Sequence, residues 1–200
     1  ETYVAYAPRG FKSFMTSMPI WLREKLFQKK IIFNELKKHD KNFNDISKIH
    51  FSEHHFSHAA SAFYPSPFKE SIVLTLDGAG EWATTTVAKG DGKNLEILKE
   101  IHFPHSIGLL YTAFTYYIGF KVNSGEYKVM GLAPYGEPKF KNLILDKLID
   151  LKDDGTFRLN MEYFDYATGL KMINDKFSGL FNQPIRNFEK DLLTQFHMNV

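Results

Sequence analysis

The chain has 200 residues, a near-neutral formal charge of +2 and no cysteine. The missing thiols exclude disulfides, zinc fingers, iron–sulfur clusters and cysteine nucleophiles, so a metal would need histidine or oxygen ligands. The hydrophobic share of 44% argues against disorder, the small charge gives no sign of nucleic acid, and no apolar run approaches the ~18 residues of a membrane helix. We expect a cytoplasmic protein of one or two small domains, without nucleic-acid or membrane partners.

Periodicity and turn residues predict a mixed α/β chain. In chain order, the first predicted elements are an irregular segment over 1–19, an amphipathic helix over 20–38, a polar turn over 40–45, a short strand over 46–50 and a helix over 57–63. Then come strands over 71–76, 82–89 and 95–103, a helix over 106–119 with Ser106 as its cap, and a glycine-rich loop with a short helix over 120–136. The last are an amphipathic segment over 140–151, a strand over 157–164 and a helix starting near Phe188.

The three consecutive strands are predicted to form an antiparallel meander with a buried central strand, because the turns between them are short. Gly90-Asp91-Gly92 is the predicted second turn. The continuous apolar run over 71–76 predicts a buried strand that delivers Asp77 at its end. Small residues over 57–63 favour a helix packed closely against a neighbour.

Four histidines precede these strands: His50, His54, His55 and His58. On a helix, His54 and His58 lie on one face one turn apart, so two ring nitrogens can meet one ion. His50 would extend that face, and His55 points elsewhere. Two histidines are too few for a closed site, so a carboxylate and open positions are needed. Hydrogen-bonded core or surface histidines are the alternative interpretation.

The segment Asp77-Gly78-Ala79-Gly80 places a carboxylate at the end of a strand. Glycines after the carboxylate let the backbone approach a phosphate and direct N–H groups towards it. A simple Asp-Gly hairpin turn is the alternative. Together with the histidines, this segment indicates a metal–nucleotide enzyme.

Two further groups of residues are candidates for function. The loop over 123–136 holds Glu126 and Lys128 among three glycines. Either these two side chains pair with each other, or Lys128 binds a phosphate as a point charge. His102 and His105 are either general acid–base residues or only capping and exposed side chains before a helix.

Four segments, in this order along the chain, carry a family resemblance: HHFSHAASAFYPSPF (54–68), DGAGEWAT (77–84), FPHSIGLLY (103–111) and GFKVNSGEYKVMGLAPYG (119–136). They resemble motifs of the O-carbamoyltransferases of nodulation and antibiotic tailoring. That family is related also to the C-terminal part of the hydrogenase maturation carbamoyltransferase. The match runs over about residues 20–137, and the chain is identified as a member of the family.

The resemblance implies an incomplete Kae1-like domain of the actin/Hsp70/sugar-kinase ATPase group, which is built on ribonuclease-H-like α/β halves. Residues 1–70 would end the first half, and residues 71–200 would start the second. It also implies an ATP-dependent enzyme that makes carbamoyl adenylate from carbamoyl phosphate and ATP. The carbamoyl group then passes to the hydroxyl of a small-molecule acceptor.

The same resemblance implies roles for particular residues. His54, His58 and Asp77 are the implied ligands of a divalent metal, iron or magnesium, that bridges nucleotide phosphates. His55 or another histidine of the site is the candidate base for the acceptor hydroxyl. The candidate nucleotide-binding residues are Gly78, Gly80, Glu126, Lys128 and Gly131.

Several parts of the family pattern are missing from the sequence. They are the N-terminal strand with its acidic phosphate motif, a second aspartate and the YrdC-like C-terminal domain that handles carbamoyl phosphate. We therefore expect a fragment of a longer enzyme that is inactive alone. Another actin-like ATPase, such as a sugar kinase, and a non-catalytic nucleotide-binding module stay open as alternatives. The sequence specifies neither the acceptor nor the oligomeric state.

Overall fold

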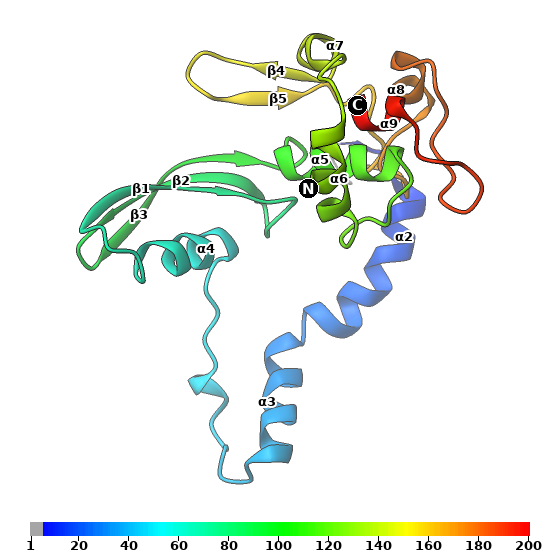
Figure 1. The fold of residues 1–200 in the computed structure, drawn as a ribbon. Helices are drawn as coiled ribbons and strands as arrows, with labels where there is room; N and C mark the ends of the chain where they lie inside the picture. Colours follow the sequence, from blue (N-terminus) through cyan, green and yellow to red (C-terminus); the bar gives the residue numbers. More distant parts are fainter. Residues whose placement is uncertain (1–5) are drawn as a thin grey trace. The chain divides into compact units, whose positions relative to one another are not determined.

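The computed structural model describes residues 6–200, which form two compact units (Figure 1). One unit comprises the described chain up to Ser52 together with Ala167–Leu170, and the other comprises Glu53–Tyr166 and Lys171–Val200. Residues 1–5 of the predicted irregular segment lie outside the described residues. Helices and antiparallel sheets are both present, so the predicted α/β class is confirmed. The division into halves at residue 70 concerns a longer fold and stays a prediction.

The first unit is helical. Its elements are α2 (Phe11–Ile20), a π-helical turn η1 (Trp21–Lys25), α3 (Gln28–His39) and a 3₁₀ turn η2 (Ile46–Lys48). The predicted irregular structure is therefore wrong for residues 11–19. Pro8 and Gly10 precede the first helical turn, and Pro19 lies in the last turn, so the helix between them forms without interruption.

The single helix predicted over 20–38 is interrupted, because Ile20 ends α2, which contains Pro19, and residues 21–25 form η1. Proline has no N–H to donate to the carbonyl four residues earlier, and the chain widens after it into η1. In η1 the N–H of Leu26 donates to the carbonyl of Trp21, five residues back, at 3.2 Å. The regular helix α3 begins only at Gln28.

The strand predicted over 46–50 is also wrong. The Asp45 carboxylate accepts hydrogen bonds from the Ser47 N–H at 2.9 Å and from the Ser47 hydroxyl at 2.6 Å, and so it caps η2. Such local side-chain bonds compete with strand pairing. The polar turn before η2 is confirmed, with a hydrogen bond from the Phe43 N–H to the Asp40 carbonyl at 3.0 Å.

The predicted antiparallel meander is confirmed in the second unit. Its strands are β1 (Glu70–Leu76), β2 (Ala83–Asp91) and β3 (Asn94–His102). They pair in the order β1-β2-β3, with the mostly buried β2 at the centre. The second turn lies at Gly92-Lys93 rather than over 90–92, because Asp91 pairs with Asn94. Gly90 lies within β2, where a Cβ atom would lie 2.5 Å from the Phe63 ring.

Strand β1 is half-exposed, contrary to the buried strand predicted from its apolar run. Val73 and Thr75 are buried on the side of helix α4 (His54–Phe63), whereas Ile72 and Leu74 are 63% and 59% exposed. β1 is an edge strand with one covered face, and an apolar run does not distinguish one covered face from two.

Helix α4 covers the inner face of the meander, as its small residues predict. Ala59 and Phe63 pack against Val73 and Ala88 in a small core. The helix begins at His54, three residues before the predicted start. All three histidines of the segment 54–58 therefore lie on it.

The rest of the second unit surrounds α5 (Ile107–Tyr117). The predicted cap is confirmed, because the Ser106 hydroxyl accepts a hydrogen bond from the Leu109 N–H at 2.9 Å. The remaining elements are α6 (Glu126–Leu132), η3 (Ala133–Tyr135), α7 (Lys141–Lys147), β4 (Ile149–Leu151), β5 (Phe157–Leu159), α8 (Asp175–Leu180) and α9 (Gln195–Asn199). The Tyr117 ring packs on Phe177 and Phe181 in the main core, and burial raises the pKa of Tyr117 to about 12.

Segment 140–151 is the short helix α7 followed by β4. Two predictions in this region need correction, and the first is the strand predicted over 157–164, which ends at Leu159. After Leu159 the backbone N–H of Asn160 turns back to the Leu148 carbonyl at 2.9 Å. The helix expected near Phe188 begins only at Gln195, because the Asp191 carboxylate accepts a hydrogen bond from the Asn187 N–H at 2.7 Å and holds a turn.

None of the helices within residues 6–200 is both long and apolar enough to cross a membrane.

Candidate metal centre

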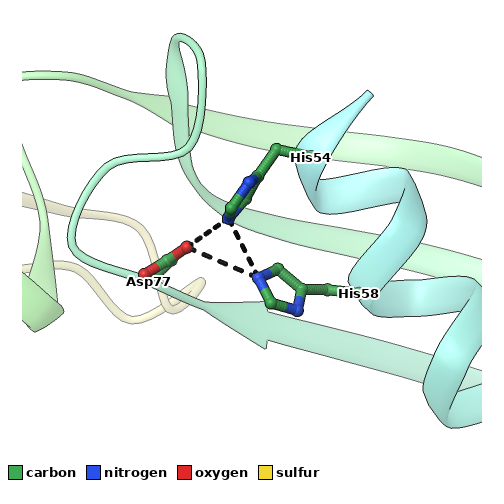
Figure 2. Close-up of side chains that lie close together, drawn as sticks. All are labelled: His54, His58 and Asp77. Carbon is green, nitrogen blue, oxygen red and sulfur yellow. Dashed lines mark hydrogen bonds and ion pairs between the residues drawn. The ribbon is translucent and has the colours of Figure 1, made fainter. Parts of the chain in front are cut away.

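Figure 2 shows three side chains that converge from two elements: His54 and His58 from α4, and Asp77 from the end of β1. His54 Nε2 lies 2.6 Å from Asp77 Oδ2 and 3.0 Å from His58 Nε2. His58 Nε2 lies 3.5 Å from Asp77 Oδ2. Within residues 6–200, these three form the one group of histidines and acids that is close enough to hold a metal ion. The structure thus brings together the three candidate ligands, and their binding of a metal stays a prediction.

The three ligand atoms fit a divalent metal. Ligands bound about 2.1 Å from a metal, at roughly right angles, are about 3 Å apart, which is close to the separations found here. Two imidazoles and one carboxylate leave other positions open, as in the ligand set that binds iron(II) in many non-haem sites. The side chains of His54, His58 and Asp77 are 44%, 52% and 34% exposed, so other ligands can reach those positions.

Asp77 is held from three directions. Its Oδ1 accepts a hydrogen bond from the Gly78 N–H at 2.6 Å, and its own N–H donates to the Thr84 carbonyl at 2.9 Å. Its carbonyl accepts a hydrogen bond from the Ser106 hydroxyl at 2.8 Å, although Ser106 also caps α5. One serine therefore links the start of α5 to the strand end that carries the metal carboxylate.

Two glycines allow close packing at the centre. A Cβ on Gly108, in the first turn of α5, would lie 2.5 Å from the backbone carbonyl of Asp77. A Cβ on Gly80 would lie 2.7 Å from the His55 ring and 2.9 Å from the His54 ring. The helix and the hairpin turn thus approach the ligands as closely as glycine permits.

The electrostatics of Asp77 favour the charged carboxylate that a metal needs. Partial burial alone would raise its pKa, but the hydrogen bonds from His54 and Gly78 and the charges of His54 and His58 outweigh it. The pKa of Asp77 is therefore lowered below its usual value.

His55 lies beneath the centre rather than in it. It is 5% exposed, and its Nδ1 lies 2.6 Å from Thr75 Oγ1, which in turn lies 2.6 Å from Thr86 Oγ1. Its Nε2 is buried without a hydrogen-bond partner. Burial lowers the pKa of His55, and the backbone of Ala83 partly opposes this effect. The side chain is neutral near pH 7, as a base requires, but its catalytic role stays a prediction.

The other candidate residues lie outside the three-residue group. His50 precedes α4, so it does not extend the helical face as expected. The N–H groups of Gly78 and Gly80 already donate to Asp77 Oδ1 and the Ala83 carbonyl. Among the described residues, neither glycine bonds to His54 or His58. Their role in holding a nucleotide phosphate stays a prediction.

Helix α6 carries the remaining three candidates. The Glu126 carboxylate accepts hydrogen bonds from the N–H groups of Asn123 and Gly125, at 2.9 and 3.0 Å, and thereby closes the start of its own helix. Lys128 Nζ lies over the Phe120 ring at 5.6 Å, a cation–π contact rather than the alternative pairing with Glu126. Gly131 has open space around it. In the described chain none of the three bonds to His54, His58 or Asp77, and their nucleotide role stays a prediction.

His102 and His105 have structural partners. His102 Nε2 lies 2.9 Å from the Glu100 carboxylate, and His105 Nδ1 accepts a hydrogen bond from the Leu159 N–H at 3.1 Å. An Nδ1 that accepts a hydrogen bond carries no proton, so His105, in the loop after β3, bonds to β5 in its neutral form. Neither residue belongs to the metal group, and these contacts favour the non-catalytic interpretation.

The neutral state of His105 predicts acid sensitivity. Burial, with a smaller effect of the Arg158 charge, lowers the pKa of His105, so the unfolded chain binds a proton more readily than the folded chain. Stability is expected to fall as the pH drops from about 6.5, the unfolded value, to the lower folded pKa, and to be unaffected by this group above about pH 7. The free energy of unfolding in urea, measured across this range, should depend less on pH in His105→Gln. An unchanged pH dependence in that variant would contradict the account.

The contacts of Thr75 with His55 and of Ser106 with Asp77 were not predicted from the sequence. The alternation of β1 places Thr75 on the same covered face as Val73, and that pattern could have located a buried hydroxyl under His55. The bond from Ser106 to Asp77 joins residues 29 positions apart, and no local pattern indicates it.

The fold and the three-residue group define an α/β protein with a candidate divalent-metal centre. A family model described as carbamoyltransferase N-terminus matches residues 1–200, so the chain belongs to the carbamoyltransferase family and corresponds to its N-terminal part. The resemblance seen in the sequence is thereby confirmed.

Three relatives illustrate the extent of the similarity. The uncharacterised protein sll1178 of Synechocystis is 60% identical over 201 residues, which cover all of this chain and 32% of that protein. Nodulation protein NolNO of Sinorhizobium fredii is 38% identical over 148 residues, 74% of this chain and 21% of that protein. Nodulation protein NolO of Bradyrhizobium diazoefficiens is 37% identical over 109 residues, 54% of this chain and 20% of that protein. The chain spans a third or less of the length of these relatives.

Proposed function

We propose that this chain supplies the metal-binding part of an ATP-dependent O-carbamoyltransferase. The observation that carries the proposal is the convergence of His54, His58 and Asp77 in a carbamoyltransferase N-terminal domain, with all three ligand atoms within 4.8 Å of one another. His54, His58 and Asp77 would hold the iron or magnesium ion, and its positive charge would neutralise nucleotide phosphates. The proposed reaction consumes carbamoyl phosphate, ATP and water and forms carbamoyl adenylate, inorganic phosphate and pyrophosphate. The carbamoyl group then passes to the hydroxyl of a small molecule, and AMP leaves.

The residues around the centre have proposed roles in that reaction. Asp77 presents one oxygen to the metal because its other oxygen is occupied by the Gly78 N–H. Thr75 fixes the ring of His55 through Nδ1, and His55 is the proposed base for the acceptor hydroxyl. If His55→Ala kept full transfer activity, the assignment of His55 as the base would fail.

The proposed fold of the longer protein is the Kae1-like member of the actin/Hsp70/sugar-kinase group. The meander β1-β2-β3 followed by α5, with an aspartate at the end of β1, supports this proposal. ATP contacts from Gly78, Gly80, Glu126, Lys128 and Gly131 remain part of it.

The nucleotide products test the proposed reaction. The intact protein, supplied with divalent metal, ATP, carbamoyl phosphate and a mixture of hydroxyl compounds, is expected to release AMP and pyrophosphate only when carbamoyl phosphate is present. Release of ADP and a phosphorylated hydroxyl compound would instead identify a sugar kinase. If no nucleotide is consumed but ATP binds, the non-catalytic nucleotide-binding module is the correct class.

A further inference from the structure

A small cavity adjoins the metal centre on the side of the hairpin turn. It has a volume of about 190 Å³ and lies between the start of α4, the turn after Asp77 and the end of β3. His54 lines it, so the cavity shares one residue with the metal centre. The other lining residues used below are Glu53, His55, Glu81, Trp82 and Glu100.

The cavity has a negative electrostatic character. Three carboxylates line it, and among its described lining residues there is no lysine or arginine. Glu100 is partly balanced by His102, whose Nε2 lies 2.9 Å from its carboxylate. Like charges at close range disfavour binding strongly. The phosphates of ATP and carbamoyl phosphate are therefore poor ligands for this cavity.

The lining suits a compact hydroxyl-bearing group. Carboxylates accept hydrogen bonds from hydroxyl and ammonium groups, and the indole of Trp82, which is 40% exposed, offers a flat apolar surface beside them. The cavity is smaller than the roughly 300 Å³ at which sites for drug-sized ligands begin. Its volume accommodates a group of the size of one sugar ring.

His55 also lines the cavity and is 5% exposed. Thr75 Oγ1 lies 2.6 Å from its Nδ1, and its Nε2 is buried, so His55 forms part of the wall of the cavity and is not a contact for a ligand.

We propose that this cavity is the acceptor pocket, in which Glu81, Trp82 and Glu100 hold a neutral or cationic hydroxyl-bearing ring beside the metal centre. The inference rests on the proposed carbamoyl transfer for the meaning of "acceptor". It assigns the two substrates to different sides: the acceptor lies against the carboxylates, and the phosphate-bearing donor approaches the metal away from them.

Binding of three probes to the intact protein tests the pocket without ATP, carbamoyl phosphate or turnover. Glucosamine and glucose, titrated by calorimetry, are expected to bind, and glucose 6-phosphate is expected to bind at least about tenfold more weakly because of its charge. Glu81→Gln and Glu100→Gln should each raise the Kd for glucosamine about tenfold, as expected when a hydrogen bond loses its charged partner. Glu96→Gln, on the same strand as Glu100 but outside the cavity, should leave the Kd unchanged.

Three results would overturn the proposal. The first is that neither glucose nor glucosamine binds, and the second is that glucose 6-phosphate binds as tightly as they do. The third is that wild type, Glu81→Gln and Glu100→Gln have equal Kd values for glucosamine. Circular dichroism of each variant identifies any that fail to fold, and Trp82→Phe then serves as a second test of the same surface. Release of AMP and pyrophosphate is measured separately. The sugar titrations can therefore contradict the acceptor pocket without contradicting the proposed reaction, and the nucleotide products can contradict the reaction without contradicting the pocket.

Discussion

Replacing Asp77 by asparagine is expected to lower the metal affinity of the intact protein by about a hundredfold or more and to abolish carbamoyl transfer. Asparagine has nearly the same shape but lacks the negative charge, and loss of residues that only support a ligand already costs about 10–100-fold. Asp77 is one of the three candidate ligands among the described residues, and its lowered pKa favours the ionised carboxylate. Metal affinity is measured by titration with iron(II) or magnesium, and transfer by formation of AMP and pyrophosphate.

Asp91→Asn is the matched control for this prediction. Asp91 lies at the exposed end of β2 in the same meander and is not in the metal group. Its replacement removes the same charge from the same sheet and should leave metal affinity unchanged. Equal affinities in wild type and Asp77→Asn would mean that the three side chains do not bind the metal.

The second large effect is expected for Gly108→Ala. The new Cβ would lie 2.5 Å from the backbone carbonyl of Asp77 and 2.6 Å from the Gly78 nitrogen, and neither backbone atom can rotate away as a side chain would. Helix α5 must therefore move from the strand end, and the bond from Ser106 to Asp77 lengthens or breaks. Overpacking of this kind typically costs about 1–3 kcal/mol. Urea unfolding should give a correspondingly lower free energy of unfolding.

Gly131→Ala is the control for Gly108→Ala. A Cβ at Gly131, within α6, would meet nothing within 4 Å. Alanine in a helix is favoured over glycine by about 0.5–1 kcal/mol, so this variant should be slightly more stable than wild type. If Gly131→Ala also weakened ATP binding, that loss would support the predicted nucleotide role of Gly131. A Gly108→Ala protein as stable as wild type would contradict the tight packing of α5 on Asp77.

The sequence predicted the elements that depend on neighbouring residues, through turn residues, a helix cap and apolar patterns. The meander follows from an apolar strand and two alternating strands, and α5 follows from its Ser106 cap and apolar residues. Helix α2 was missed because Pro19 looks like a helix breaker, although at the end of a helix it only redirects the chain into η1. The exposure of β1 depends on which faces of the sheet are covered, and the strand's own sequence does not contain that information.

The candidate metal centre likewise combines features that the local sequence predicts with features that depend on tertiary contacts. The spacing of His54 and His58 and the position of Asp77 after a strand were readable, because helix period and strand end are local properties. The hydrogen bond from Ser106, the burial of His55 and the contact of Lys128 with Phe120 all join segments that meet only through tertiary packing. Sequence patterns therefore named the ligands but not what holds them in place.

X-ray diffraction at the iron absorption edge, on crystals of the intact protein loaded with iron(II), tests the metal centre most directly. The account predicts an anomalous peak about 2.0–2.2 Å from His54 Nε2, His58 Nε2 and an Asp77 carboxylate oxygen. A fully loaded protein with the peak elsewhere, or with no peak among these three residues, would contradict it.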